Sequence, residues 1–232
     1  MKKLGIIGAM SVEVELLKEK MENLTVTSHA GMEFYDGVLN NMNAVVVQCG
    51  VGKVNAAMCA QILCSVFGVT HLVNTGIAGS LCAQLDIADL VVSRDAMYHD
   101  FDCVHFGYEM GRVPGMDTVA FPANEMLIRH AFDAAEEVNP GHSRIGRVAS
   151  GDLFVAEKTA KERIIEKTGA ICTEMEGAAI AQVAYRNRVP FVILRAISDK
   201  ADDSAEMDYP TFETLAAHRC ARITMLLAEK LQ

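Results

Sequence analysis

The chain has 232 residues, of which 51% are hydrophobic, and this length and composition fit one α/β domain with a sizeable core. They exclude a disordered or collagen-like chain. There are 21 basic and 30 acidic residues, so the net charge is 21 − 30 = −9. Because no basic stripe accompanies this charge, we expect no binding to nucleic acid. We expect one domain over residues 1–232.

The seven cysteines are odd in number and include no CxxC pair, so they predict neither a disulfide framework nor a zinc site. Small buried thiols in a reducing cytosol account for them. No apolar run approaches the roughly 20 residues that a membrane-spanning helix needs. We therefore expect a cytoplasmic protein that binds no membrane, no metal and no cofactor.

The first half of the chain alternates apolar stretches with helical patterns. Leu4–Gly8 predicts a buried strand, and Val12–Met21 predicts a helix. The next expected elements are two strands around an Asn-rich turn (Met32–Leu39 and Ala44–Cys49), a helix (Val54–Phe67) and strands at His71–Thr75 and Leu90–Ser93. A long connection, Tyr98–Pro122, shows no period, and its aromatic residues favour a functional segment over a disordered one.

The second half continues the alternation of helices and strands. The expected elements are a helix (Asn124–Val138), a strand (Arg144–Ser150), a helix (Lys158–Thr168), a short strand (Ala170–Thr173), a helix (Met175–Arg188), a strand (Phe191–Ile197) and a last helix (Tyr209–Leu231). This alternation, broken only by the early hairpin, predicts a layered α/β domain with a mixed sheet.

Ligands of such folds bind beyond the carboxyl ends of strands, and two of these ends in the first half carry unusual residues. Small residues after the first strand lead to Glu13, in the first helical turn, where a carboxylate is favoured even without a function. The segment Asn74–Ser80 contains a Gly-x-Ala-Gly turn whose N–H groups suit a polar ligand, although an ordinary tight turn fits equally well.

Two further strand ends, in the second half, carry charged residues among apolar ones. Glu174 and Glu176 stand in an apolar segment, where a helix start explains one of them and Glu176 is expected to face the interior. Arg195 interrupts a central strand and needs a carboxylate partner, for which Glu176 is the candidate. Asp199 ends that strand, either as a functional group or as the cap of the following helix.

Seven segments, in order and over essentially the whole chain, resemble the 5′-methylthioadenosine/S-adenosylhomocysteine nucleosidases of the purine nucleoside phosphorylase superfamily. They are GIIGAM with Glu13, GVGKVNAA (50–57), NTGIAG (74–79), YHDFD with FGYEMGRVPG (98–115), SGDLF (150–154), TEMEGAAIA (173–181) and RAISD (195–199). The resemblance implies a three-layer α/β/α fold of the phosphorylase/hydrolase type and a homodimer. It implies hydrolysis of the N-ribosidic bond of both nucleosides, releasing adenine and the thio-substituted ribose.

The resemblance also assigns roles to individual residues. Asp199 would be the acid at N7 of adenine, and Glu13 the base that activates water. The remaining residues implied for substrate binding are Glu176 at the ribose diol, Arg195 beside it and near the water, Gly79 and Met175 along the ribose, Phe154 and Val155 at the adenine, Ser198 and Ile77 in the same pocket, and Met10, Tyr209, Cys103, Phe106 and Pro114 around the 5′ thioether. The Cys103–Pro114 segment would come from the neighbouring subunit.

Two positions depart from the family pattern, and other activities compete. Ile77 stands where some relatives carry a hydroxyl, and Lys200 would lower the pKa of Asp199 only if it pointed inward.

A related futalosine-type or 5′-deoxyadenosine nucleosidase would share nearly all of these residues. A phosphorylase would need an Arg in the glycine loop after the first strand, and a non-catalytic purine-binding protein would need neither Glu13 nor Asp199.

Overall fold

The computed structural model describes residues 2–202 and 204–232, and its centre is a mixed β-sheet. The strands are β1 (Leu4–Gly8), β2 (Met21–His29), β3 (Met32–Leu39), β4 (Met42–Gln48), β5 (His71–Ser80), β6 (Leu90–Tyr98), β7 (Phe121–Pro122), β8 (Ser143–Ser150), β9 (Cys172–Glu174) and β10 (Phe191–Asp199). The helices are α1 (Ser11–Glu19), α2 (Lys53–Ser65), the 3₁₀ turn η1 (Val104–Phe106), α3 (Glu125–Val138), α4 (Lys158–Thr168), α5 (Gly177–Asn187) and α6 (Ala205–Lys230).

The strand order along the sheet is β10-β6-β8-β9-β5-β1-β4-β3-β2. The sheet is mixed, because β1 runs parallel to β4 and β5, whereas β10 is antiparallel to β6 and β9 is antiparallel to β5. A further parallel pairing joins β10 to β5, so five strands close into a ring. The carboxyl ends of β5 and β10 therefore lie side by side, and the short strand β9 pairs with the end of β5 at the same place.

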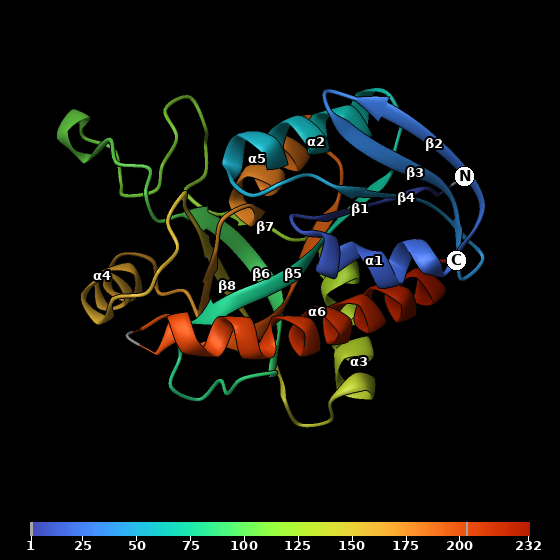
Figure 1. Cartoon of the computed structure of the whole chain (residues 1–232). Helices are drawn as coiled ribbons and strands as arrows, with labels where there is room; N and C mark the ends of the chain where they lie inside the picture. The colour runs from blue at the N-terminus through green and yellow to red at the C-terminus, as the bar shows by residue number, and fades with distance from the viewer. Residues whose placement is uncertain (1, 203) are drawn as a thin grey trace.

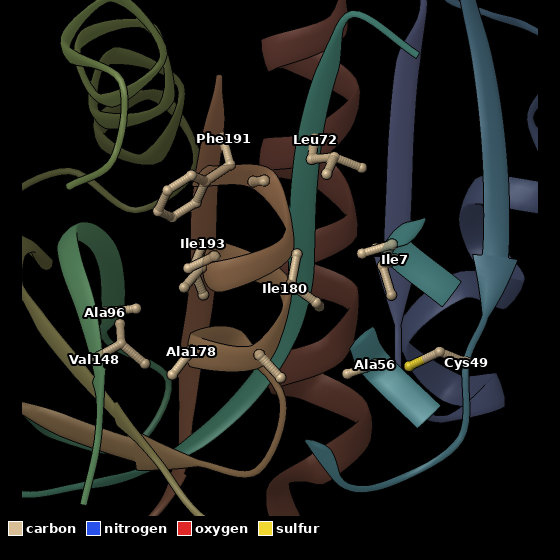
Figure 2. Close-up of a cluster of buried hydrophobic side chains, with 14 of the residues drawn as sticks. Ile7, Cys49, Ala56, Leu72, Ala96, Val148, Ala178, Ile180, Phe191 and Ile193 are labelled. Carbon is tan, nitrogen blue, oxygen red and sulfur yellow. The ribbon is translucent and has the colours of Figure 1, made fainter. Parts of the chain in front are cut away.

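Helices cover both faces of the sheet, as the alternating pattern predicts (Figure 1). One hydrophobic core lies between the sheet and the pair α2 and α5, where Ala178 and Ile180 of α5 pack near Ile193 of β10 (Figure 2). A second core lies under α1, α3 and α6. Burial on both faces explains why the central strands read as continuous apolar runs.

The structure corrects the predicted Gly-x-Ala-Gly turn. Residues 76–79 are strand, because β5 continues to Ser80 and pairs with β10 from Arg195↔Gly76 to Asp199↔Gly79. The strand β2 is also absent from the sequence prediction. It is an edge strand whose side chains are almost all exposed, so it lacks the apolar alternation that marks a strand. Likewise β6 continues to Tyr98, five residues past its predicted end.

The segment 99–120 leaves β6 and projects from the body of the molecule (Figure 1). Its only regular element within the described chain is the short turn η1, and its side chains include Phe106, which is 79% exposed. Across the described residues, no helix has the length and apolar character needed to cross a bilayer.

Candidate active site

A cavity opens at the carboxyl ends of β1, β5, β9 and β10, the place where ligands bind in open α/β sheets. Eleven of the predicted site residues line it: Met10, Glu13, Ile77, Gly79, Phe154, Val155, Met175, Glu176, Ser198, Asp199 and Tyr209. These residues come from segments that are up to 199 positions apart in the chain. The ring closure of the sheet brings the strand ends among them together.

Glu13 is the third residue of α1, and its carboxylate turns back into the cavity floor. One oxygen, Oε2, accepts hydrogen bonds from the backbone N–H groups of Ala9 at 2.6 Å and Met10 at 3.0 Å. The other, Oε1, accepts from the N–H of Ile77 at 3.1 Å. Burial raises the pKa of Glu13, and the charge of Arg195 and these three donors oppose that rise. The carboxylate is thus buried, fixed in orientation and more basic than usual.

The approach of Glu13 to β5 requires a glycine at position 76. A Cβ there would lie 2.4 Å from Oε1 of Glu13 and 3.1 Å from Nη1 of Arg195. Side-chain atoms cannot approach that closely, so any other residue would push the carboxylate out of place. The glycine that the sequence analysis placed in a turn therefore serves a close packing contact within a strand.

Asp199 ends β10, where the pairing with β5 shifts register between Ile197 and Asp199. Such irregularities re-aim a side chain near functional sites. Its Oδ2 accepts a hydrogen bond from the Ser198 hydroxyl at 2.8 Å, and its Oδ1 accepts from the Ala201 N–H at 2.8 Å. Burial raises the pKa of Asp199, and these two hydrogen bonds oppose the rise.

The predicted ion pair between Glu176 and Arg195 is wrong, because the partner of Arg195 is Glu174. The Arg195 guanidinium donates to Oε2 of Glu174 and to Oδ1 of Asn74, and its side chain is 2% exposed. Both glutamates line the cavity, but Glu174 ends β9 and reaches Arg195 of β10, whereas Glu176, just before α5, reaches the backbone of Gly52. Arg195 itself does not appear on the cavity wall.

Glu174 also organises the start of α5. Its two oxygens accept hydrogen bonds from the backbone N–H groups of Glu176 and Gly177, at 2.8 to 3.2 Å. It also accepts from the hydroxyl of Ser150, which in turn accepts from the N–H of Ala178 at 2.7 Å. A carboxylate at this place satisfies the free N–H groups of the helix and complements its dipole.

Glu176 reaches the opposite wall of the cavity, where its Oε1 accepts a hydrogen bond from the Gly52 N–H at 2.8 Å. Burial, followed by repulsion from Glu174, raises its pKa to about 8, and the charge of Arg195 opposes the rise. Its other oxygen has no partner recorded among the described residues, so it is free to accept from a ligand.

Apolar and aromatic side chains form the outer part of the cavity. Phe154 is 47% exposed, and its ring meets the ring of Tyr209 edge-on at 5.6 Å between centroids. The Tyr209 hydroxyl lies 3.1 Å from Sδ of Met10. Three segments, from β1–α1, from 151–155 and from α6, therefore meet at the mouth, and the exposed face of Phe154 suits stacking against a flat ring.

Besides Arg195, three predicted site residues lie outside the cavity of their own chain. Cys103, Phe106 and Pro114 belong to the projecting segment 99–120.

Lys200 does not point at Asp199, because its ammonium group pairs with Asp86 at 2.7 Å and with the carbonyl of Leu85 at 2.8 Å.

Several residues of the site escaped the sequence analysis. The additional cavity residues are Ala9, Val51, Ala78, Leu153, Thr173 and Glu174. Most of them are apolar neighbours of predicted residues and carry no signal of their own. Glu174 had one, since it precedes Glu176 by two positions, but a helix start explained it equally well. Among the residues that the structure describes, no group of three His, Cys, Asp or Glu side chains could hold a metal.

Comparison with known proteins agrees with this geometry. Residues 3–229 match the family model described as "Phosphorylase superfamily". The chain is 43% identical to a 5′-methylthioadenosine/S-adenosylhomocysteine nucleosidase from Treponema pallidum, with 98% of this chain and 93% of the relative covered. It is 40% identical to the enzyme of the same name from Halalkalibacterium halodurans, with both chains covered completely.

Solved structures give the same result. The nucleosidase from Neisseria meningitidis in complex with methylthio-immucillin-A superposes with a TM-score of 0.96 at 35% identity, covering 99% of this chain and 100% of that one. A futalosine hydrolase from Helicobacter pylori superposes with a TM-score of 0.94 at 32% identity, covering 99% and 98%. The chain therefore belongs to the phosphorylase superfamily and, within it, to the family of 5′-methylthioadenosine/S-adenosylhomocysteine nucleosidases.

Proposed function

We propose that this enzyme hydrolyses the N-ribosidic bond of 5′-methylthioadenosine and S-adenosylhomocysteine, releasing adenine and the thio-substituted ribose. The observation that carries the proposal is the presence of two buried carboxyl groups, Glu13 and Asp199, on one cavity and held by separate sets of hydrogen bonds. The reaction needs two proton transfers at opposite ends of the breaking bond, and each group serves one of them.

The chemistry follows from the two environments. Asp199, whose pKa is raised by burial, donates a proton to N7 of adenine, so that the base leaves as a neutral molecule when the C1′–N9 bond breaks. Glu13 takes a proton from the water whose oxygen bonds to C1′. Exchange with solvent then returns a proton to Asp199 and removes one from Glu13, which restores both groups.

Different parts of the cavity contact the ribose, the adenine and the 5′ thioether. Glu176 accepts hydrogen bonds from the ribose hydroxyls through its free oxygen, with Gly79 and Met175 beside the ribose. Phe154 stacks on the adenine and the backbone of Val155 meets its N1/N6 edge. Met10 and Tyr209 form the part of the pocket that receives the 5′ thioether.

The proposal includes a homodimer in the cytoplasm. The segment 99–120 presents exposed apolar side chains, among them Val104 and Phe106, which suit burial in a second copy of the chain. Cys103, Phe106 and Pro114 would complete the thioether pocket of the neighbour. All seven cysteines are free thiols, which suits a reducing compartment.

A futalosine hydrolase is the second candidate, because one such enzyme is among the similar structures. Adenine release from a panel of 5′-substituted adenosines, compared with base release from futalosine, separates the two. We expect the highest kcat/KM for the thioethers. Activity toward futalosine alone would assign the second function, and binding of adenine without turnover of any nucleoside would leave a purine-binding protein.

A further inference from the structure

Two segments that border the cavity are tied to each other and to the start of the projecting segment 99–120 by charged side chains that do not line the cavity. Lys53 begins α2, Asp100 is the second residue of the projecting segment 99–120, and Asp152 immediately precedes the cavity residues Leu153 and Phe154. The Lys53 ammonium lies 2.5 Å from Oδ2 of Asp100 and 3.6 Å from Oδ2 of Asp152. This group of three side chains is called the Lys53 cluster below.

Backbone donors join the same cluster. The Lys53 N–H donates to Oδ1 of Asp152 at 2.9 Å, and the Asp152 N–H donates to Oδ2 of Asp100 at 2.9 Å. The packing behind it is tight: a Cβ on Gly151 would lie 2.3 Å from the imidazole of His99 and 2.9 Å from the carboxyl carbon of Asp100. The start of the segment 99–120 thus lies directly against the loop that carries Phe154.

Each tied segment presents one group to the substrate. The turn before Lys53 supplies the Gly52 N–H that holds Glu176, and the loop after Asp152 supplies Phe154. The segment after Asp100 carries Phe106, which in the proposed dimer enters the pocket of the neighbour. By contrast, Glu13 and Asp199 take their hydrogen bonds from Ala9, Met10, Ile77, Ser198 and Ala201, none of which belongs to the cluster. The cluster is therefore placed to affect substrate binding and not the two proton transfers.

We propose that Lys53 is a positioning residue for substrate binding: by holding Asp100 and Asp152 it fixes the base-stacking loop, the Gly52 turn and the start of the segment 99–120 relative to one another. This inference rests on the proposed function. It differs from a stability role, because the side chains of the cluster are 23%, 28% and 49% exposed, and ion pairs this exposed contribute little to the free energy of unfolding.

The test compares Lys53→Met with Lys53→Arg in the full-length enzyme, measuring kcat and KM for 5′-methylthioadenosine and the melting temperature. For Lys53→Met we expect KM to rise roughly tenfold and kcat to change less than KM. A misplacement of about 1 Å in a group that positions the substrate can cost ~10²-fold, so the expected loss lies within that range. Lys53→Arg retains the charge and should recover most of the loss. Asp100→Asn should raise KM in the same direction.

Lys3 offers a matched control far from the cavity. Its ammonium pairs with Asp36 at 2.7 Å, with exposures of 25% and 33%, and lies 5.8 Å from the Phe67 ring, as Lys53 lies 5.6 Å from the Tyr98 ring. Lys3→Met should leave KM unchanged. A Lys53→Met enzyme with KM within twofold of the wild type, or an equal rise in Lys3→Met, would overturn the inference. A wild-type enzyme that does not cleave the substrate would refute the proposed function instead, and direct measurement of adenine binding to the same variants would then test the positioning role alone.

Discussion

At the scale of single residues, the two proposed proton transfers are assigned to Glu13 and Asp199. We expect Asp199→Asn and Glu13→Gln each to lower kcat by roughly 10²-fold or more, the size of general acid–base catalysis. Both replacements keep the shape of the side chain, so circular dichroism and the melting temperature should show an intact fold. Near-normal turnover in either folded variant would remove that residue from its role.

Glu176 should make the folded protein less stable as pH rises. Pairing with Arg195 would have lowered its pKa and given the opposite dependence. Burial raises its folded-state pKa to about 8 from an ordinary value of 4.5. Between these values the folded protein holds a proton that the unfolded chain has released, so the wild type loses stability as pH rises through this window. Gln at this position cannot ionise and avoids the loss.

We therefore expect the melting temperature of ligand-free Glu176→Gln, relative to wild type, to increase from pH 5 to pH 8, although substrate binding weakens. Thermal unfolding of both proteins across this range measures the difference. A difference that stays constant, or that falls with rising pH, would show that the carboxyl group of Glu176 is ionised throughout.

At the scale of elements, the contact between β9, β10 and α5 depends on Glu174. Glu174→Gln leaves the buried Arg195 guanidinium without its counter-charge, and breaking a buried pair in this way costs about 3–5 kcal/mol. Chemical denaturation of Glu174→Gln and of the double variant Glu174→Gln with Arg195→Met measures the free energy of unfolding of each. The difference between them gives the cost of the unpaired Arg195 charge. The double variant should recover part of the stability, and a double variant less stable than Glu174→Gln alone would contradict this account.

The sequence predicts most elements because burial on both faces leaves clear apolar runs, as in Leu4–Gly8 and Phe191–Ile197. It misses β2, whose exposed edge carries no such pattern. It also predicts a turn at Gly76–Gly79, because small residues are typical of turns. In the structure these residues belong to β5, and the missing side chain of Gly76 leaves room for Glu13 and Arg195 to pack against the strand. That contact joins positions more than 60 residues apart, so local reasoning could not find it.

The site follows the same rule. Glu13 and Asp199 stand at strand ends and are found from the chain alone, whereas the choice between Glu174 and Glu176 as the partner of Arg195 depends on which way the short strand β9 faces. Glu174 is the last residue of β9 and Glu176 lies past its end, so the sequence leaves the choice open until the extent of β9 and its pairing with β5 and β8 are known.

At the scale of the whole molecule, a homodimer accounts for the apolar segment 99–120. Light scattering should show a dimer at micromolar concentration. Mixing Asp199→Asn with Phe106→Ala chains, followed by subunit exchange, should restore activity above that of either parent, because one mixed site then has both an intact Asp199 and the partner's intact Phe106. A fully active monomer would contradict the shared pocket.

We expect water, and not phosphate, to attack the ribose. In the proposed mechanism Glu13, in the first turn of α1, lies beside the reacting carbon, and a phosphate dianion about 4 Å from a carboxylate would be repelled by several kcal/mol at an effective dielectric constant near 20. Arg195, the cation nearest to Glu13 in the described site, is already engaged by Glu174 and Asn74. The site thus suits deprotonation of water and lacks the free guanidinium that a phosphate site would use.

The most direct measurement is cleavage of 5′-methylthioadenosine in ¹⁸O-labelled water with and without added phosphate, with the products analysed by mass spectrometry. Hydrolysis predicts adenine and a free thio-substituted ribose labelled at C1, at a rate that does not depend on phosphate. Phosphate-dependent formation of an unlabelled ribose 1-phosphate would contradict the account and assign the enzyme to phosphorolysis.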